Sequence, residues 1–250
     1  MLAALPVFFF AGAFFAHRFF YEVPVLMYHH VDRVPEHAGT FVSPESFERQ
    51  MEFLKVHHYR VISLSQLIHE MKEGRKIPPR TVSITFDDGF LDNFRHAFPT
   101  LKKMDFPATL FMITSNIGRE DWLGEEDLRI LDESNITIGS HTVHHAFLPE
   151  LPSDQIKKEL VDSKETLRHI LGHDVSLFSY PAGGLTPEIE TMVSDAGYEG
   201  AVTTNYGEAK ADLYAIRRIK IGESAGNLFN FWIKVSGYYR LGKRHVFAAE

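Results

Sequence analysis

The chain has 250 residues, of which 44% are hydrophobic and 24% are charged, so it is long enough to bury the core of one large or two small domains. The absence of cysteine excludes disulfides, cysteine-bound zinc and a thiol nucleophile. The formal net charge of −7 argues against nucleic acid as a partner.

The stretch from Met1 to Ala16 carries no charged side chain and is rich in Phe, Leu and Ala. It is short for a membrane span and suits the apolar part of a signal peptide, with Ala11-Gly12-Ala13 as a small-residue cleavage site. We expect residues 1–20 to be a signal peptide or signal anchor, and residues 21–250 to be a separate domain outside the cytoplasm. The alternatives are a buried core segment or a misassigned start. An anchor would associate the protein with a membrane.

Strands and helices are predicted to alternate along the rest of the chain. Apolar or β-branched runs predict strands at 23–28, 61–63, 81–86, 108–113, 136–140, 175–180, 200–204 and 216–221. Cap residues and helical spacing predict helices at 44–57, 64–73, 93–104, 125–133 and 153–171, from 187 onward, and at 228–235. This alternation predicts an α/β protein with a parallel sheet, and seven or eight such units favour a barrel over an open sheet.

Two adjacent carboxylates follow one of these strands. The apolar run 81–86 ends at Asp87-Asp88-Gly89. Ionised carboxylates at the end of a buried strand are paired, protonated or bound to a cation, and the glycine allows a tight turn. A metal ion held by one Asp, with the other free for proton transfer, fits this pattern. The alternative is a solvated turn, which Asp and Gly also favour.

A histidine pair follows a second strand. His141 and His145 are four residues apart, so on one helical turn their rings would share a face and grip one ion. Two His and one Asp leave coordination positions open, which is the layout of a hydrolytic metal site. His144 is the alternative ligand. Because the loops after the carboxyl ends of barrel strands form the active site, we expect both motifs to converge on one rim.

Four segments together resemble the polysaccharide deacetylases, the NodB-homology or carbohydrate esterase 4 group. Residues 85–89 and 140–145 are similar to the family's first two motifs. Residues 25–31 resemble the N-terminal signature of the subgroup that contains the poly-N-acetylglucosamine deacetylases, and residues 178–183 are similar to that subgroup's third motif. The resemblance extends over most of the chain.

The resemblance implies a distorted (β/α) barrel and a divalent metal, zinc first, with cobalt, nickel, manganese and iron as alternatives. It implies that Asp87 is the general base and that a backbone N–H of the third motif, that of Ala182, binds the oxyanion, with Tyr180 of the same motif beside the substrate. The implied metal ligands are Asp88, His141 and His145.

Two departures from the family pattern bear on the remaining roles. Ser179 stands where many members carry an Arg that orients the base, and residues 216–221 contain no His to serve as the acid. The biofilm subgroup shares both features and takes its acid from the N-terminal motif, which implies His29, although a strand-capping role is the alternative. His30 has the weaker claim, because strand neighbours point to opposite faces. Arg217 or Arg218 orients Asp87, and the facing of the strand decides which.

The expected activity is metal-dependent removal of N-acetyl groups from an amino-sugar polymer such as poly-N-acetylglucosamine, peptidoglycan or a chitin-like glycan. The alternatives are an acetyl-ester or small-amide hydrolase on the same fold and a catalytically silent glycan-binding module. Trp122 either stacks on a sugar or packs at the surface. A basic tail is solvated or contacts an anionic lipid or polymer; it comprises Lys234, Arg240, Lys243, Arg244 and His245.

Overall fold

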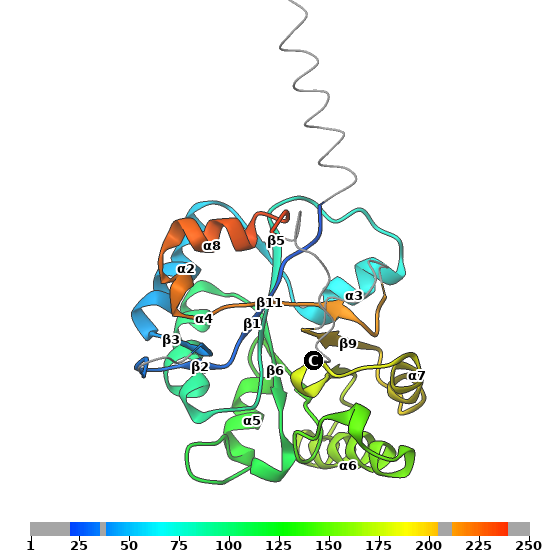
Figure 1. Ribbon diagram of the computed structural model, residues 1–250. Helices are drawn as coiled ribbons and strands as arrows, with labels where there is room; N and C mark the ends of the chain where they lie inside the picture. The colour runs from blue at the N-terminus through cyan, green and yellow to red at the C-terminus, as the bar shows by residue number, and fades with distance from the viewer. Residues whose placement is uncertain (1–20, 36–38, 205–211, 240–250) are drawn as a thin grey trace, which may run out of the picture.

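The protein, seen in a computed structural model (Figure 1), is described over residues 21–35, 39–204 and 212–239. The signal or anchor prediction for residues 1–20 and most of the basic tail lie outside these residues. The strands are β1 Val25–Tyr28, β2 His30–Val31, β3 Phe41–Val42, β4 Arg60–Val61, β5 Thr81–Phe86, β6 Ala108–Met112, β7 Ile136–Ser140, β8 Leu177–Ser179, β9 Gly200–Thr203, β10 Ile216–Arg217 and β11 Ile219–Lys220. The helices are α2 Pro44–Val56, α3 Leu64–Lys72, α4 Phe98–Met104, α5 Glu125–Asp132, α6 Ser153–Leu171, α7 Pro187–Asp195 and α8 Leu228–Val235.

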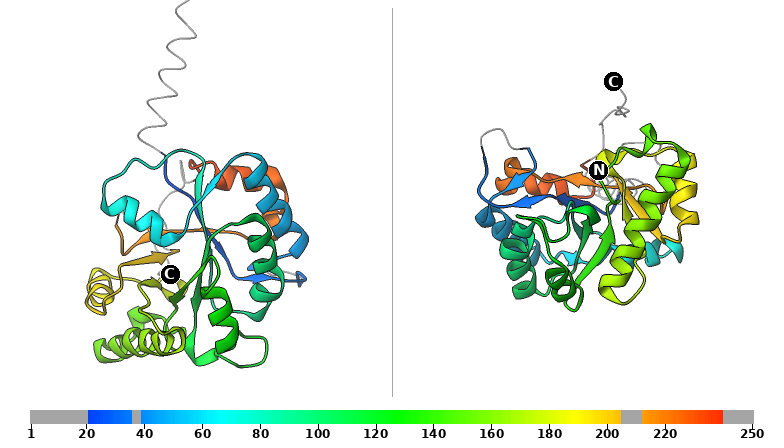
Figure 2. Two further views of the ribbon diagram at one scale, coloured as in Figure 1. Left: turned by 180° about the vertical axis from the view of Figure 1, so that it is seen from behind. Right: turned by 90° about the horizontal axis from the view of Figure 1, so that it is seen from below.

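Strands β2 and β3 pair with each other, and the other nine strands form one parallel sheet that nearly closes on itself. Its order is β10-β9-β8-β7-β6-β5-β1-β11, with β4 beside β5. The two outer strands, β10 and β11, are consecutive in the chain and separated only by Arg218, so one short segment pairs with both β9 and β1. The helices lie outside this curved sheet (Figure 2). The predicted distorted (β/α) barrel is therefore confirmed.

Local sequence signals account for most of the elements. The Ser43 hydroxyl caps α2 with Pro44 in the first turn, and Thr186 caps α7 in the same way with Pro187. All six residues of β5 are buried, as expected for a strand covered on both faces. Gly172 ends α6 with a φ of 78°, a left-handed conformation that glycine adopts without strain.

Two predicted elements differ from the observed ones. The strand predicted at 216–221 is broken at Arg218 into β10 and β11, because the two halves pair with opposite edges of the sheet. The helix predicted at 93–104 begins with a π-helical turn, Asn93–Ala97, before α4. Single π-helical turns are often found beside functional sites, and this one follows the Asp-Asp-Gly loop.

The largest apolar cluster lies between the sheet and helices α2, α4, α5 and α8, and a separate cluster lies under α6 and α7. Because these apolar clusters fill the space between the sheet and the helices, the polar residues that could form an active site lie at the ends of the strands. Among the described residues, none of the helices combines the length and the apolar character needed to span a bilayer.

Candidate active site

The structure brings most of the predicted site residues to one rim of the barrel. Asp87 and Asp88 directly follow β5, His141 follows β7, and His29 follows β1. Because all of these strands are parallel, their carboxyl ends meet on the same side. Gly89 closes the turn with a φ of 91°, and a Cβ there would lie 2.0 Å from the Met112 sulfur, so a larger residue does not fit.

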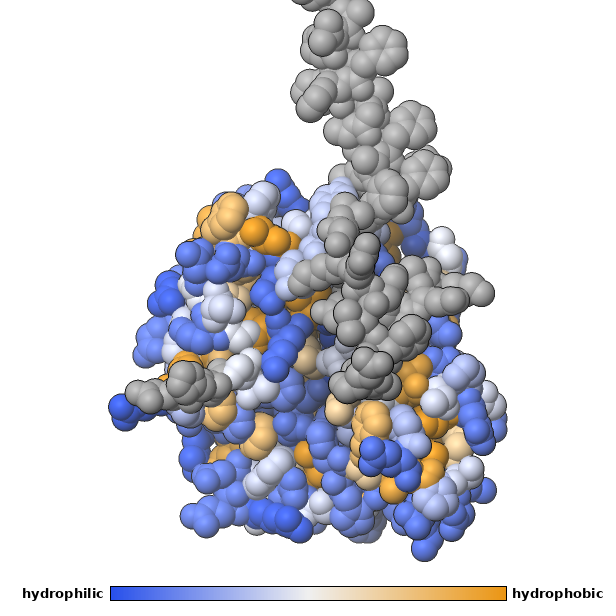
Figure 3. Space-filling view, viewed as in Figure 1, coloured by the Kyte–Doolittle hydropathy of each residue, from blue (hydrophilic) through white to orange (hydrophobic). Residues whose placement is uncertain are grey.

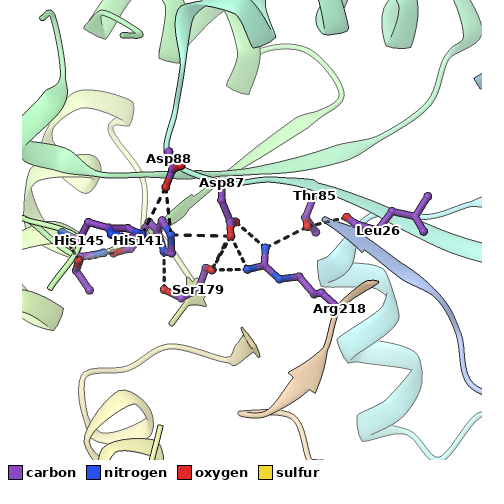
Figure 4. A network of polar contacts seen from close by, with 10 residues as sticks. Leu26, Thr85, Asp87, Asp88, His141, His145, Ser179 and Arg218 are labelled. Carbon is purple, nitrogen blue, oxygen red and sulfur yellow. Dashed lines mark hydrogen bonds and ion pairs between the residues drawn. The ribbon is translucent and has the colours of Figure 1, made fainter. Parts of the chain in front are cut away.

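Asp88, His141 and His145 form a group suited to one metal ion. The Asp88 Oδ1 lies 3.5 Å from His141 Nε2 and 3.6 Å from His145 Nε2, and all three ligand atoms lie within 4.8 Å of one another. A tetrahedral ion with bonds of about 2.1 Å separates its ligands by about 3.4 Å, so the spacing fits a site of this kind. Figure 4 shows the three side chains converging beside Asp87.

A hydrogen bond sets the tautomer of His141. Its Nδ1 lies 2.8 Å from the Ser179 carbonyl oxygen, which only accepts hydrogen bonds. Nδ1 must therefore carry the proton and donate it, which leaves the Nε2 lone pair facing Asp88. Metal-binding histidines are commonly oriented by such a bond from the other ring nitrogen.

The loop that carries both histidines is not helical. Residues 141–147 lie outside any helix, and both Thr142 and His145 have positive φ angles, of 66° and 56°. The expectation that one helical turn aligns His141 with His145 is therefore wrong, although the rings do converge, with centroids 4.8 Å apart. The loop folds back because the Thr142 hydroxyl accepts a hydrogen bond from the His145 N–H at 2.9 Å.

Glu159 of α6 holds this loop from outside. Its buried carboxylate accepts hydrogen bonds from the N–H groups of Val143 and His144, at 2.8 and 3.0 Å, and lies 2.7 Å from the His144 Nδ1. His144 is thus turned toward α6 and is not part of the metal-ligand group. We did not predict the role of Glu159 from the sequence; the available signal was an acidic residue next to the apolar face of a long amphipathic helix.

The guanidinium of Arg218 forms a bidentate ion pair with the Asp87 carboxylate. Nη1 and Nη2 of Arg218 each lie 2.5 Å from one Asp87 oxygen, and both side chains are almost completely buried. Arg218 Nη1 also donates to the Thr85 hydroxyl, at 3.2 Å, and Nη2 to that of Ser179, at 2.9 Å (Figure 4). Such paired hydrogen bonds fix the plane of the carboxylate.

The structure decides which arginine faces the base. Arg218 sits at the break between β10 and β11 and points into the barrel, whereas Arg217 pairs with Glu22 at 2.6 Å. The Ser179 hydroxyl, at the position where the family pattern led us to expect an orienting Arg, accepts a hydrogen bond from the Arg218 guanidinium. The orienting cation therefore comes from the segment that closes the sheet.

The two carboxylates have opposite pKa shifts. Burial alone would raise the pKa of Asp87, but the charges of Arg218 and His141, together with the Arg218 hydrogen bonds, bring it well below its usual value. Burial, followed by repulsion from Asp87, raises the pKa of Asp88 to about 7. Asp87 is thus ionised in the folded protein, while Asp88 gains from a cation that would neutralise its charge.

His29 and His30 have different surroundings. The His29 Nδ1 is buried without a hydrogen-bond partner, and burial lowers the pKa of His29 to about 4, against the opposing effect of the Asp87 charge. His30 instead lies 2.6 Å from Asp92 and its ring stacks on those of Phe41 and Phe90. His29 is therefore neutral in the free protein at neutral pH and can act as an acid only after it gains a proton during turnover.

The two residues predicted from the third motif, Ala182 and Tyr180, lie in different surroundings. Ala182 is exposed and has a φ of 51°. Within the described part of the chain, its N–H donates no hydrogen bond to another backbone group. The Tyr180 N–H instead donates to the Val202 carbonyl, and its ring packs against Phe178 in the cluster under α6 and α7, away from Ser179. Of the two predicted residues, Ala182 alone has a backbone N–H free for an oxyanion, and Tyr180 lies outside the site.

Trp122 lies beside the rim. Its ring centroid is 4.5 Å from that of Phe90, and its main chain forms a bridge with that residue. The ring is partly buried against the core, in agreement with the packing alternative. A sugar contact at its remaining exposed edge stays a prediction.

The fold and these residues define a hydrolase of the polysaccharide deacetylase type, and known proteins agree. A family model described as polysaccharide deacetylase matches residues 74–201. YxkH of Bacillus subtilis, whose name places it among the polysaccharide deacetylases, is 32% identical over 221 residues, covering 85% of this chain and 76% of its own length. A poly-beta-1,6-N-acetyl-D-glucosamine N-deacetylase of Staphylococcus aureus is 28% identical over 205 residues, covering 74% and 69%.

The deacetylase PplD of Streptococcus pyogenes, solved in complex with acetate, has a TM-score of 0.77 and 27% identity, covering 84% of this chain and 97% of its own. The chain belongs to the polysaccharide deacetylase family.

Proposed function

We propose that this protein is a metal-dependent deacetylase that hydrolyses N-acetyl groups on an N-acetylglucosamine-containing polysaccharide outside the cytoplasm. The observation that carries the proposal is the joint geometry of one ion-binding group and one adjacent, ionised carboxylate that does not belong to it. The similarity to a poly-beta-1,6-N-acetyl-D-glucosamine deacetylase supports the substrate class. The apolar stretch 1–16 supports export or anchoring.

Asp88, His141 and His145 would hold the metal, which when bound supplies a lowered water pKa and a positive charge for the substrate carbonyl. Asp87 accepts the proton of the attacking water, because Arg218 keeps its carboxylate ionised and oriented. The N–H of Ala182 donates a hydrogen bond to the oxyanion, a contribution commonly worth about 3 kcal/mol of barrier. His29 then protonates the departing amine.

Acetate release from N-acetylglucosamine oligomers, measured with and without a chelator, tests the proposal. We expect release that stops with chelator and returns when zinc or another divalent metal is added back. Release from O-acetylated but not N-acetylated sugars would point to an acetyl-esterase instead. Glycan binding with no turnover under any metal would identify a silent binding module.

The role of His29 has its own test, because only a poor leaving group needs an acid. We expect His29→Ala to slow the hydrolysis of N-acetylglucosamine oligomers by about 10²-fold or more while leaving a nitrophenyl acetate ester nearly unaffected. His30→Ala is the matched control beside it. Equal losses on both substrates would assign His29 to the structure of the site rather than to proton donation.

A further inference from the structure

Helix α8 is apolar on its outer face as well as on its inner face. Phe231 and Val235 are buried in the main core, whereas Leu228, Phe229 and Trp232 are 37%, 64% and 49% exposed. We call these last three the α8 patch. Figure 3 shows an apolar area over α8 at the upper left, among largely hydrophilic surroundings. A cluster of exposed large apolar side chains usually marks a contact surface.

The patch lies at the end of the molecule where the described chain begins. The Glu22 N–H donates to the Gly237 carbonyl, at 3.1 Å, and the rings of Tyr21 and Tyr238 are 6.1 Å apart, so the chain just after α8 touches the chain just after residue 20. Both Figure 1 and the left view of Figure 2 place α8 along this end. The first described residues, which follow the stretch 1–20 in the sequence, therefore lie close to the C-terminal end of the helix that carries the α8 patch.

The charge of this region differs from that of the whole chain. The chain carries a net charge of −7, yet no Asp or Glu occurs from Ser224 to Ala249. The same segment contains four cations, Lys234, Arg240, Lys243 and Arg244. As a stretch of sequence, this segment combines aromatic residues and cations with no acids, a composition that suits a surface that is both apolar and anionic. Of the four cations, Lys234 lies in the described part of the chain.

We propose that the α8 patch lies in the interface of an anionic lipid bilayer, with Phe229 and Trp232 at the depth of the headgroups. Tryptophan and phenylalanine are favoured at this depth, and each nearby cation adds attraction to anionic lipid. The same orientation turns the active site away from the lipid. The Tyr21 hydroxyl bonds to Thr81 at the start of β5, and Asp87 follows its far end, about 20 Å away.

The chain has two tryptophans, so each can be observed alone. In full-length Trp122→Phe protein, Trp232 is the remaining tryptophan. We expect its emission to shift to the blue when vesicles of phosphatidylglycerol and phosphatidylcholine are added, and to be quenched by phosphatidylcholine brominated along its acyl chains. Full-length Trp232→Phe protein, which reports on Trp122 at the opposite rim, is the matched control and should show neither change.

This design separates the patch from residues 1–20, because it reads the surroundings of one side chain rather than binding of the whole chain. If the protein floats with vesicles while Trp232 emission stays unchanged and unquenched, the proposal is overturned. If acrylamide fails to quench Trp232 even without lipid, the patch is covered by residues 1–20 or by a second copy, which also overturns it. Sedimentation would then distinguish those two occupants.

A second variant tests how much the α8 patch contributes to vesicle binding. The double substitution Phe229→Ser with Trp232→Ser should slow the transfer of acetate-releasing activity into the vesicle fraction and lower its final share at least several-fold, without changing activity on soluble oligomers. Ile130→Ser, which removes an exposed apolar residue on α5, is the matched control and should leave vesicle binding unchanged. Equal vesicle binding by the double variant and Ile130→Ser would contradict the proposal.

Discussion

The two halves of the active site are built in different ways. The base half consists of Asp87, Arg218, Ser179 and Thr85, which lie in strands or directly beside them and are almost fully buried. The ligand half includes the loop from His141 to His145, in which the His145 side chain is 42% exposed. Strand pairing fixes the first half, whereas hydrogen bonds that backbone N–H groups of the loop donate to the side chains of Glu159 and Thr142 fix the second.

Because the two halves are built differently, substitutions in them should affect stability and metal affinity to different degrees. The side chains of the base half are buried and packed or hydrogen-bonded on all sides, so substitutions there should reduce stability as well as turnover. The ligand loop is buried at His141 but exposed at His144 and His145, so substitutions in its outer part should mainly reduce the affinity for the ion. The predictions below test this division, from the largest expected effect to the smallest.

The largest effect is expected at His141. His141→Ala removes a ligand whose Nε2 faces Asp88, so we expect loss of the bound metal and of detectable acetate release. Metal content after gel filtration and initial rates measure both. His144→Ala is the matched control, because His144 is turned toward Glu159, and it should keep its metal. Metal loss in the His144 variant instead would restore His144 as the ligand.

Asp87→Asn should separate chemistry from metal binding. The amide keeps the shape of the side chain but cannot accept a proton from water, so we expect kcat to fall by about 10²- to 10⁴-fold. The metal content should stay near that of the unaltered protein, since Asp87 is not in the ligand group. A variant that retained full turnover would show that another residue is the base.

Arg218→Met should cost stability. It leaves the Asp87 carboxylate buried without its partner, which typically costs about 3–5 kcal/mol of unfolding free energy. Without the guanidinium, the pKa of Asp87 should rise, so the acid limb of the pH–rate profile should move to higher pH. Arg217→Met, which breaks a partly exposed pair with Glu22, should cost about 0–1 kcal/mol and leave the profile in place. Urea titration and pH profiles check both, and equal effects would contradict the assignment of Arg218.

Glu159→Gln tests the support of the ligand loop. The neutral amide accepts the loop N–H groups less strongly, so the loop should sample more conformations and bind the metal about 10- to 100-fold more weakly. Glu165→Gln, on the exposed face of the same helix, is the control. Competition with a chromophoric chelator measures both affinities. Unchanged affinity in the Glu159 variant would mean that the loop is rigid by itself.

The smallest effect concerns pH. Burial and the neighbouring Asp87 raise the pKa of Asp88 to about 7 in the metal-free protein, above its value in the unfolded chain. Below pH 7 a proton therefore competes with the metal, and the affinity should fall up to about tenfold per pH unit, whereas above pH 7 this dependence should level off. His141, with a pKa near 4, adds no dependence near neutrality. Calorimetric titration between pH 5 and 8 measures the metal affinity. An affinity that stays constant over this range would contradict the prediction.

In the metal-free protein, the stability of the fold should change with pH in the opposite direction to the metal affinity. Because the pKa of Asp88 is raised on folding, its contribution to stability is complete below the unfolded pKa near 3.8 and is lost as the pH rises toward 7. Asp88→Asn should remove this dependence, and thermal unfolding of metal-free protein across this range would measure it.

The sequence by itself determined the order of strands and helices and the placing of Asp87, Asp88, His141 and His29 after strand ends. These features depend on residues close together in the chain: apolar periodicity, helix caps and strand-ending turns act over a few positions. A loop with two residues at positive φ also brings positions four apart together, so the convergence of the His141 and His145 rings was predicted for the wrong local reason.

Only the tertiary structure decided which arginine faces Asp87, what holds the ligand loop, and where Tyr180 points. Arg218 faces inward because the last strand breaks to pair with both edges of the sheet, and no local pattern encodes that break. Glu159 and the loop it holds are brought together by the packing of α6. Contacts of this kind depend on how distant segments meet, and the energy that selects them comes from the whole closed barrel.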